Sequence, residues 1–162
     1  MTDTLPPDAP PRPSQTLGEI GLTHFAPYLM NRIMGRYNGD LQAELKRHGL
    51  TTMKMRTLAV LAVVPGLTIN ELSVYAVSEQ STMSRTLEAL EAAGLVRREE
   101  RQSDGRVREI YLTEAGRSHF DLIWPLLYDG YRKLFEGIDR EERQAFVQTL
   151  QKMLRNVRRN DF

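Results

Sequence analysis

The stretch TINELSVYAVSEQSTMSRTLEALEAAGLV, residues 68–96, decides the fold of this chain. It opens with Thr68 and carries Glu71 three residues later, which is the spacing of a capping box. In that motif each of the two side chains accepts a hydrogen bond from a backbone N–H at the start of a helix, where the helix itself offers no partner. The stretch therefore predicts a short helix over residues 72–76.

A second helix is predicted over residues 79–93, with Ser78 as its N-terminal cap and Gly94 as its terminator. Its apolar side chains recur every three or four residues and should face the core: Met83, Leu87 and Leu90. Two short helices joined by a tight turn form a helix-turn-helix, in which the second helix lies in the major groove of DNA and the first supports it.

The first turns of the 79–93 helix present short or forked side chains that can reach base edges and phosphates: Gln80, Ser81, Thr82, Ser84 and Arg85. Arg85 is suited to a guanine or to a phosphate. We expect these five residues to contact DNA. The alternative is that they form only the solvated face of an amphipathic helix.

Residues 95–100 and 107–112 alternate in the manner of two strands, and Ser103-Asp104-Gly105 between them predicts a turn. This hairpin is rich in arginine: Arg97, Arg98, Arg101, Arg106 and Arg108. An exposed arginine ribbon suits the minor groove, so we expect Arg101 and Arg106 to contact DNA, with Asp104 holding the guanidinium of Arg106. The alternative is a solvated hairpin whose arginines pair with its own acids: Glu99, Glu100 and Glu109.

Six pieces of the chain, taken in order, resemble the MarR family of bacterial regulators: GLT (49–51), PGLTINELS (65–73), STMSR (81–85), LEAAGLV (90–96), DGR (104–106) and LTEAG (112–116). The resemblance implies a homodimer that binds a pseudo-palindromic operator, usually a repressor released by a small aromatic or phenolic ligand. It places Ser81, Thr82, Ser84 and Arg85 on the DNA-reading helix, and Asp104 and Arg106 on the Asp-x-Arg element of the wing. Relatives commonly carry a charged residue where this chain has Gly105, and the lack of cysteine argues against the thiol-based peroxide sensors.

Long amphipathic helices are predicted on either side of this module. Their apolar stripes run from Phe25 to Leu45, from Phe120 to Leu134 and from Phe146 to Val157. One small module cannot cover such long stripes, so we expect a twofold dimer, with a helical subdomain within one chain as the alternative. The expected fold is mainly α-helical with a small β-hairpin wing (α+β), divided into four parts: a disordered proline-rich arm 1–16, an N-terminal dimerisation helix 17–48, a winged helix-turn-helix 49–115 and C-terminal dimerisation helices 116–162.

A small-molecule effector site is expected where the dimerisation helices meet the DNA-binding part. Methionine adapts to irregular aromatic guests, and the candidates are Met30, Met34, Tyr37, Met53 and Met55. The alternative is that these side chains only pack the core. Trp124 is interpreted as a core or dimer-interface residue.

Composition and net charge exclude several classes of function. The net charge is only +1, so any DNA binding must come from locally placed cations. There is no cysteine, the three histidines fall on separate predicted helices, and no catalytic motif is present, so we expect no enzyme, metal or cofactor. Without an apolar run of about 20 residues or a signal peptide, no membrane association is expected, and the cytoplasm is the expected location. Two alternatives remain open: a helical dimer that serves as a protein–protein interaction module, and an activator or architectural protein of the same fold.

Overall fold

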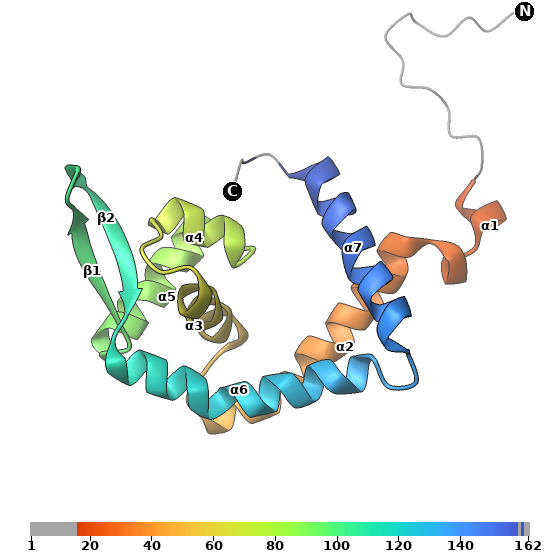
Figure 1. Ribbon diagram of the computed structural model, residues 1–162, viewed down its shortest axis with the longest axis horizontal. Coiled ribbons are helices and arrows are strands. Elements are labelled where there is room, and N and C mark those ends of the chain that lie inside the picture. The colour runs from red at the N-terminus through yellow and green to blue at the C-terminus, as the bar shows by residue number, and fades with distance from the viewer. Residues whose placement is uncertain (1–15, 159, 161–162) are drawn as a thin grey trace, which may run out of the picture. The chain divides into compact units, whose positions relative to one another are not determined.

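The computed structural model describes residues 16–158 and residue 160, so nearly all of the expected proline-rich arm lies outside the described residues. The elements follow one another as α1 (Leu17–Ile20), η1 (Leu22–His24), α2 (Ala26–Arg47), α3 (Thr52–Val63), α4 (Ile69–Tyr75), α5 (Gln80–Ala92), β1 (Val96–Arg101), β2 (Asp104–Leu112), α6 (Glu114–Leu134) and α7 (Arg140–Val157) (Figure 1). A mainly helical chain with one two-stranded antiparallel hairpin in its described part confirms the predicted fold class.

Two compact units divide the chain, and the boundary falls inside α2, between Arg36 and Tyr37. The N-terminal unit contains a feature that the sequence did not predict, a single-turn helix α1. Thr16 and Glu19 form its capping box: the backbone N–H of Thr16 donates to Glu19 Oε2 at 2.6 Å, and that of Glu19 to Thr16 Oγ1 at 3.3 Å. The long helix begins only at Ala26, as Pro27 required.

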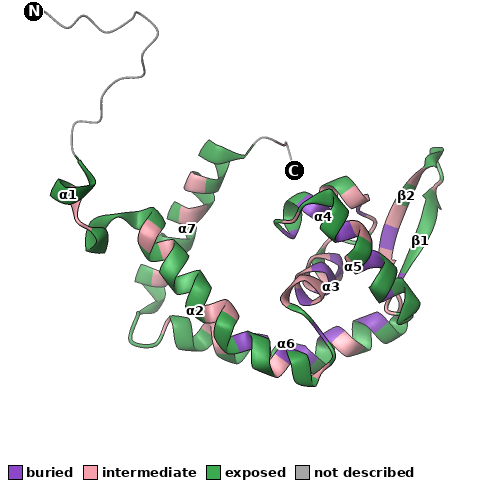
Figure 2. Ribbon diagram, turned by 180° about the vertical axis from the view of Figure 1, so that it is seen from behind, coloured by how far each residue is buried: buried purple, intermediate pink, exposed green. Residues whose placement is uncertain are grey.

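The core of the larger unit collects the apolar faces of several helices. Leu45, Leu58, Leu72, Met83 and Leu90 are fully buried. Figure 2 shows buried positions on α3, α4 and α5 and along the first half of α6, whereas α7 carries none, and all of its residues are described. Part of the stripe that we expected a dimer to cover is thus covered within one chain: Phe120, Ile123 and Leu127.

Side-chain caps start most of these helices. Thr51 accepts from the N–H of Lys54 at 3.2 Å, and Thr68 and Glu71 form the predicted capping box. Because that box starts a helix at once, α4 begins at Ile69 and not at residue 72. Asp139 caps α7 through the N–H of Glu142 at 2.8 Å.

The predicted cap of α5 is wrong by one residue, because Glu79 is the N-cap and makes no side-chain capping bond. Ser78 still belongs to the end of α4: its N–H donates to the carbonyl of Ser73 at 2.9 Å. The chain reverses at Val77, which has φ of 54°. A left-handed conformation costs a residue with a Cβ about 1–2 kcal/mol, so the turn between the two helices is held under strain.

The hairpin is longer than predicted, and its turn is earlier. Arg101 pairs with Asp104, which leaves Gln102 and Ser103 as the turn and places Asp104 and Gly105 inside β2. The β2 strand is also joined to the loop before α4. There the N–H of Gly66 donates to the Ile110 carbonyl at 3.0 Å, and the Ile110 N–H donates to the Leu67 carbonyl at 2.9 Å.

A close approach joins the hairpin to α6. Thr113 Oγ1 donates to the Gly94 carbonyl at 2.6 Å and also accepts from the N–H of Gly116 at 3.0 Å, so one hydroxyl both anchors and caps the helix. A Cβ on Gly116 would lie 1.9 Å from the backbone oxygen of Leu95. Only glycine lets α6 start this close to the end of α5.

We therefore expect Gly116→Ala to lower the free energy of unfolding by about 3 kcal/mol, because the backbone must move to relieve the overlap. Gly39→Ala is the matched control, since it adds the same methyl group to a helix interior with no atom within 4 Å. It should raise stability by about 0.5–1 kcal/mol. Urea unfolding followed by circular dichroism measures both, and equal stabilities for the two variants would contradict the packing described.

Candidate nucleic-acid interface

The outward face of α5 is set by its buried face. Met83, Leu87 and Leu90 are at most 1% exposed, so the opposite side of the helix must face solvent. The structure places the predicted DNA-contacting residues there: Gln80, Ser81, Thr82 and Arg85 are exposed, and Ser84 is half-buried.

Polar groups on this face differ in whether they are already bonded. Ser84 Oγ donates to Glu88 Oε1 at 3.2 Å. Among the residues that the structure describes, no carboxylate lies within 4 Å of the Arg85 guanidinium. No side chain caps the first turn of α5 either. This helix therefore has uncapped backbone N–H groups in its first turn and an unpaired cation, Arg85, in its second turn, and both kinds of group are suited to phosphate.

Four arginines of the hairpin are paired with acids. The N···O distances are 2.6 Å for Arg97–Glu99, 3.3 Å for Arg98–Glu91, 2.5 Å for Arg101–Glu109 and 2.9 Å for Arg108–Glu100. Within the described hairpin, Arg106 is the arginine without such a partner. The structure thus brings Arg106 to the exposed tip, whereas Arg101, also expected to contact DNA, lies in an ion pair.

The expected role of Asp104 needs correction. Its Oδ1 accepts from the backbone N–H of Arg106 at 3.0 Å and does not hold the guanidinium. A short aspartate side chain readily accepts a hydrogen bond from the backbone N–H two residues later. This local hydrogen bond forms here in place of an ion pair with the guanidinium of Arg106. Asp104 therefore shapes the tip of the hairpin and leaves the Arg106 side chain unrestrained.

A hydrogen-bonded network lies within the hairpin. The alternative interpretation expected the hairpin arginines to pair with acids that include Glu109, but the sequence did not predict that Tyr111 also joins Glu109. The two carboxylate oxygens of Glu109 accept from Arg101 Nε at 2.5 Å and from the Tyr111 hydroxyl at 2.9 Å. These two bonds, the one from Arg101 first, lower the pKa of Glu109, and the bond to Glu109 raises the pKa of Tyr111. A Cβ at Gly66 would lie 2.8 Å from the Tyr111 hydroxyl, so the network also closes the loop before α4 against the strand.

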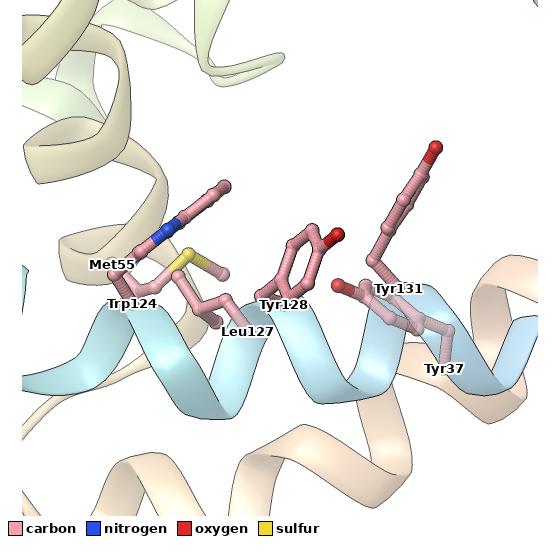
Figure 3. A pocket seen from close by; sticks show the side chains of 6 residues that line it. All are labelled: Tyr37, Met55, Trp124, Leu127, Tyr128 and Tyr131. Carbon is pink, nitrogen blue, oxygen red and sulfur yellow. The ribbon is translucent and has the colours of Figure 1, made fainter.

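An apolar pocket lies elsewhere in the larger unit. Its volume is about 320 Å³, and six side chains line it: Tyr37, Met55, Trp124, Leu127, Tyr128 and Tyr131 (Figure 3). They come from α2, α3 and α6. None of the six is charged, and burial raises the pKa of Tyr37. The rings of Trp124 and Tyr128 continue along α6 at 6.0 Å between centroids.

The pocket includes only part of the set expected from sequence. Tyr37 and Met55 line it, whereas Met53 packs, partly buried, against the core. Met30 and Met34 belong to the N-terminal unit. Trp124 was interpreted as a core or dimer-interface residue. It is 51% exposed in the single chain, so it is not a core residue, and its place in a dimer interface stays a prediction. The sequence did contain a signal for the rest of the lining. Four residues at helical spacing share one face of α6, but the expected set did not include them: Trp124, Leu127, Tyr128 and Tyr131.

Neither site has the donors of a metal centre. In the described part of the chain, His, Asp and Glu side chains nowhere gather in a group of three that could hold a metal ion. No helix among the described residues combines the length and the hydropathy that crossing a bilayer requires.

The lowered pKa of Glu109 predicts a pH-dependent loss in Glu109→Gln. The ionised carboxylate stabilises the folded chain above its ordinary pKa of 4.5, and this contribution disappears as the pH falls through its lower value in the folded state. Wild type should be more stable than the variant at about pH 7, and the difference should shrink at about pH 3. Glu100→Gln, in the exposed pair with Arg108, is the control and should change stability less. A difference in urea unfolding that is equal at both pH values would contradict the network.

Comparison with known proteins agrees with this geometry. The model of the MarR family matches residues 48–107. The transcriptional regulator HosA of Escherichia coli O157:H7 is 30% identical over 133 residues, 82% of this chain and 97% of the relative. The transcriptional repressor IacR of Pseudomonas putida is 28% identical over 84% of this chain and 79% of its own length. A MarR-family regulator from Silicibacter pomeroyi has a crystal structure with a TM-score of 0.86 and 51% identity, covering 91% of this chain and 100% of that one. The chain belongs to the MarR family of transcription regulators.

Proposed function

We propose that this regulator binds double-stranded DNA sequence-specifically as a homodimer at a pseudo-palindromic operator, and that a small aromatic effector releases it. In this proposal α5 enters the major groove, and the tip of the hairpin enters the adjacent minor groove. One observation carries the proposal: two arginines, Arg85 on the outward face of α5 and Arg106 at the tip, have no acidic partner among the residues that the structure describes. As a protein acting on the chromosome, it would act in the cytoplasm.

The pairing of the other arginines supports this assignment of roles. A paired arginine must leave its carboxylate before it can bind a phosphate, whereas Arg85 and Arg106 lose no ion pair on binding. Glu91, Glu99, Glu100 and Glu109 in turn keep the paired arginines in place and give the hairpin a fixed shape. We therefore assign Arg85 and Arg106 to DNA contact, and Arg101 to holding the hairpin through Glu109.

Exposed apolar side chains on α6 and α7 favour the homodimer. Leu122, Trp124, Leu154 and Val157 are all more than half exposed in the single chain. Apolar surface on this scale is normally covered by a partner, and a second copy supplies the same helices by twofold symmetry. A dimer would present two α5 helices about 34–36 Å apart, one turn of DNA, as a palindromic operator requires.

The domain assignment follows from this arrangement. Residues 49–115 would form the DNA-binding winged helix, and residues 17–48 and 116–162 the dimerisation helices. Leu41, Leu45, Phe120, Ile123 and Leu127 belong to the core of the winged helix as well. One part of α2 and of α6 would therefore pack in the core of the winged helix, and the rest of each helix would form the dimer interface.

We propose that the protein represses transcription, because two of its relatives are named as transcriptional repressors. IacR is a transcriptional repressor, and so is Mb2911 of Mycobacterium bovis, 35% identical over 101 residues, 61% of this chain and 73% of that relative. A protein of the same fold, MepR of S. aureus, has a crystal structure as a complex with DNA.

The lining of the pocket supports an effector that is aromatic and uncharged. Four of its six side chains are aromatic and none carries a charge, so a buried anion would lack a counter-ion there. Other proteins of this fold have ligands that contain an aromatic group but are anionic, so they support the aromatic part of this proposal alone: CouR of Rhodococcus jostii has a structure with p-coumaroyl-CoA, and DNA binding by BpsR of Bordetella bronchiseptica is regulated by 6-hydroxynicotinic acid.

Arg106→Ala and Arg85→Ala should each weaken binding to a duplex selected from a random pool by about 5- to 150-fold, while the fold stays intact. Arg108→Ala is the matched control in the same hairpin, because its guanidinium is already paired with Glu100. It should weaken binding less. Fluorescence anisotropy at fixed salt measures the affinity of all three variants for the duplex. Unchanged affinity in both Arg106→Ala and Arg85→Ala would show that α5 and the tip of the hairpin do not contact DNA.

A neutral aromatic compound should bind the pocket more tightly than the matching anion, for example indole compared with indole-3-carboxylate. Trp124 is the one tryptophan of the chain and lines the pocket, so its fluorescence should report binding. Tyr128→Ala should weaken binding of the compound and leave DNA binding in its absence unchanged. Tighter binding of the anion, or the same affinity in wild type and the Tyr128 variant, would contradict the proposed site.

A further inference from the structure

An acidic side chain occupies the face of α5 that is proposed to enter the major groove. Glu88 is exposed and follows Arg85 by three residues and Ser81 by seven, so all three lie on the side opposite the buried Met83 and Leu87. A carboxylate that approaches duplex DNA is repelled by the phosphates. Its presence there requires a compensating contact.

The Glu88 carboxylate is held in one orientation by its own helix. Ser84 Oγ, one turn earlier, donates to Glu88 Oε1 at 3.2 Å. Arg85 lies three residues before Glu88, yet the two side chains form no ion pair. Among the described residues, the second carboxylate oxygen of Glu88 has no hydrogen-bond partner. The outward face thus carries a hydrogen-bond donor, Arg85, and an acceptor, Glu88, that do not neutralise each other.

The chemistry of the major groove selects the base that such an acceptor can bind. An ionised carboxylate only accepts hydrogen bonds, so guanine, which offers O6 and N7, and thymine, which offers O4, repel it. Adenine places the acceptor N7 beside its amino group, which cancels part of the attraction. Cytosine presents its N4 amino group alone.

We infer that Glu88, positioned by Ser84, is a specificity-determining residue that selects a cytosine in each half-site and rejects thymine and guanine there. The inference rests on the proposed DNA binding. It adds that the acidic residue is retained for discrimination, at a cost in general affinity for DNA. Arg85 beside it is suited to a guanine or a phosphate, so the two side chains would set different positions of the site.

Selection of duplexes from a random pool tests this with wild type, Glu88→Gln, Ser84→Ala and Glu141→Gln. Wild type should enrich a motif with one cytosine per half-site that Glu88→Gln loses or replaces with adenine, because an amide can bond both N6 and N7. In wild type, changing that cytosine to thymine should weaken binding by about 5- to 150-fold. Ser84→Ala should weaken the preference, because the carboxylate then moves freely.

Glu141→Gln is the matched control, since it removes the same charge from the first turn of α7, outside the winged helix. It should leave the motif unchanged. Glu88→Gln keeps the shape of the side chain at an exposed position and should fold as wild type does by circular dichroism.

The same motif in wild type and Glu88→Gln would overturn the inference, and so would an equal loss of affinity for every sequence. Both results leave the proposed DNA binding standing. If wild type enriches no sequence at all, the proposed function itself fails, and the inference fails with it.

Discussion

Burial of one face of α5 is the constraint on which the rest depends. Met83, Leu87 and Leu90 are removed from water among the side chains of α3 and α4, and this fixes the rotation of the helix about its axis. Each residue turns a helix by about 100°, so a shift of the apolar pattern by one position would carry Arg85 off the outward face. The polar side chains of α5 therefore face outward because its apolar side chains are buried, and no hydrogen bond or ion pair of the polar side chains is needed to place them there.

Hydrogen bonds and close packing then attach the hairpin to that helix. Thr113 and Gly116 join the start of α6 to Gly94 and Leu95, immediately after α5. The Glu109 network joins Arg101, the last residue of β1, to Tyr111 near the end of β2. The hairpin is therefore held along its length, and Asp104 shapes its tip without restraining the side chain of Arg106.

Much of this arrangement could be predicted from the sequence, because it depends on local rules. Apolar spacing, the Thr68–Glu71 capping box and the alternating hairpin gave the order of the elements. Local rules failed where two of them competed. Ser78 is a good capping residue, but it lies in the turn that closes α4, and its hydroxyl donates to the Glu79 carbonyl at 3.1 Å. The N-cap is therefore Glu79, one residue later. Asp104 and Gly105 are typical turn residues, but the register places them in the strand.

The sequence left open which hairpin arginines pair with acids, and it could not predict the cavity, because both depend on where side chains lie in three dimensions. The acids of the hairpin were visible in the sequence, but only the side-chain geometry shows that Arg101 pairs with Glu109, although Arg101 lies opposite Asp104 in the register, and that Arg106 pairs with no acid among the described residues. The pocket likewise joins Tyr37, Met55 and four residues of α6. Methionine content alone favoured Met30, Met34 and Met53, whereas most of the lining is aromatic.

Methylation protection of a selected duplex tests the central claim most directly, because dimethyl sulfate modifies guanine N7 in the major groove and adenine N3 in the minor groove. The account predicts that bound protein protects guanine N7 in two patches, with centres about one helical turn apart, and adenine N3 in the minor groove beside each patch. Arg106→Ala should remove the adenine protection and keep the guanine patches. Full reactivity of the guanines under saturating protein would show that α5 does not enter the major groove and would contradict the account.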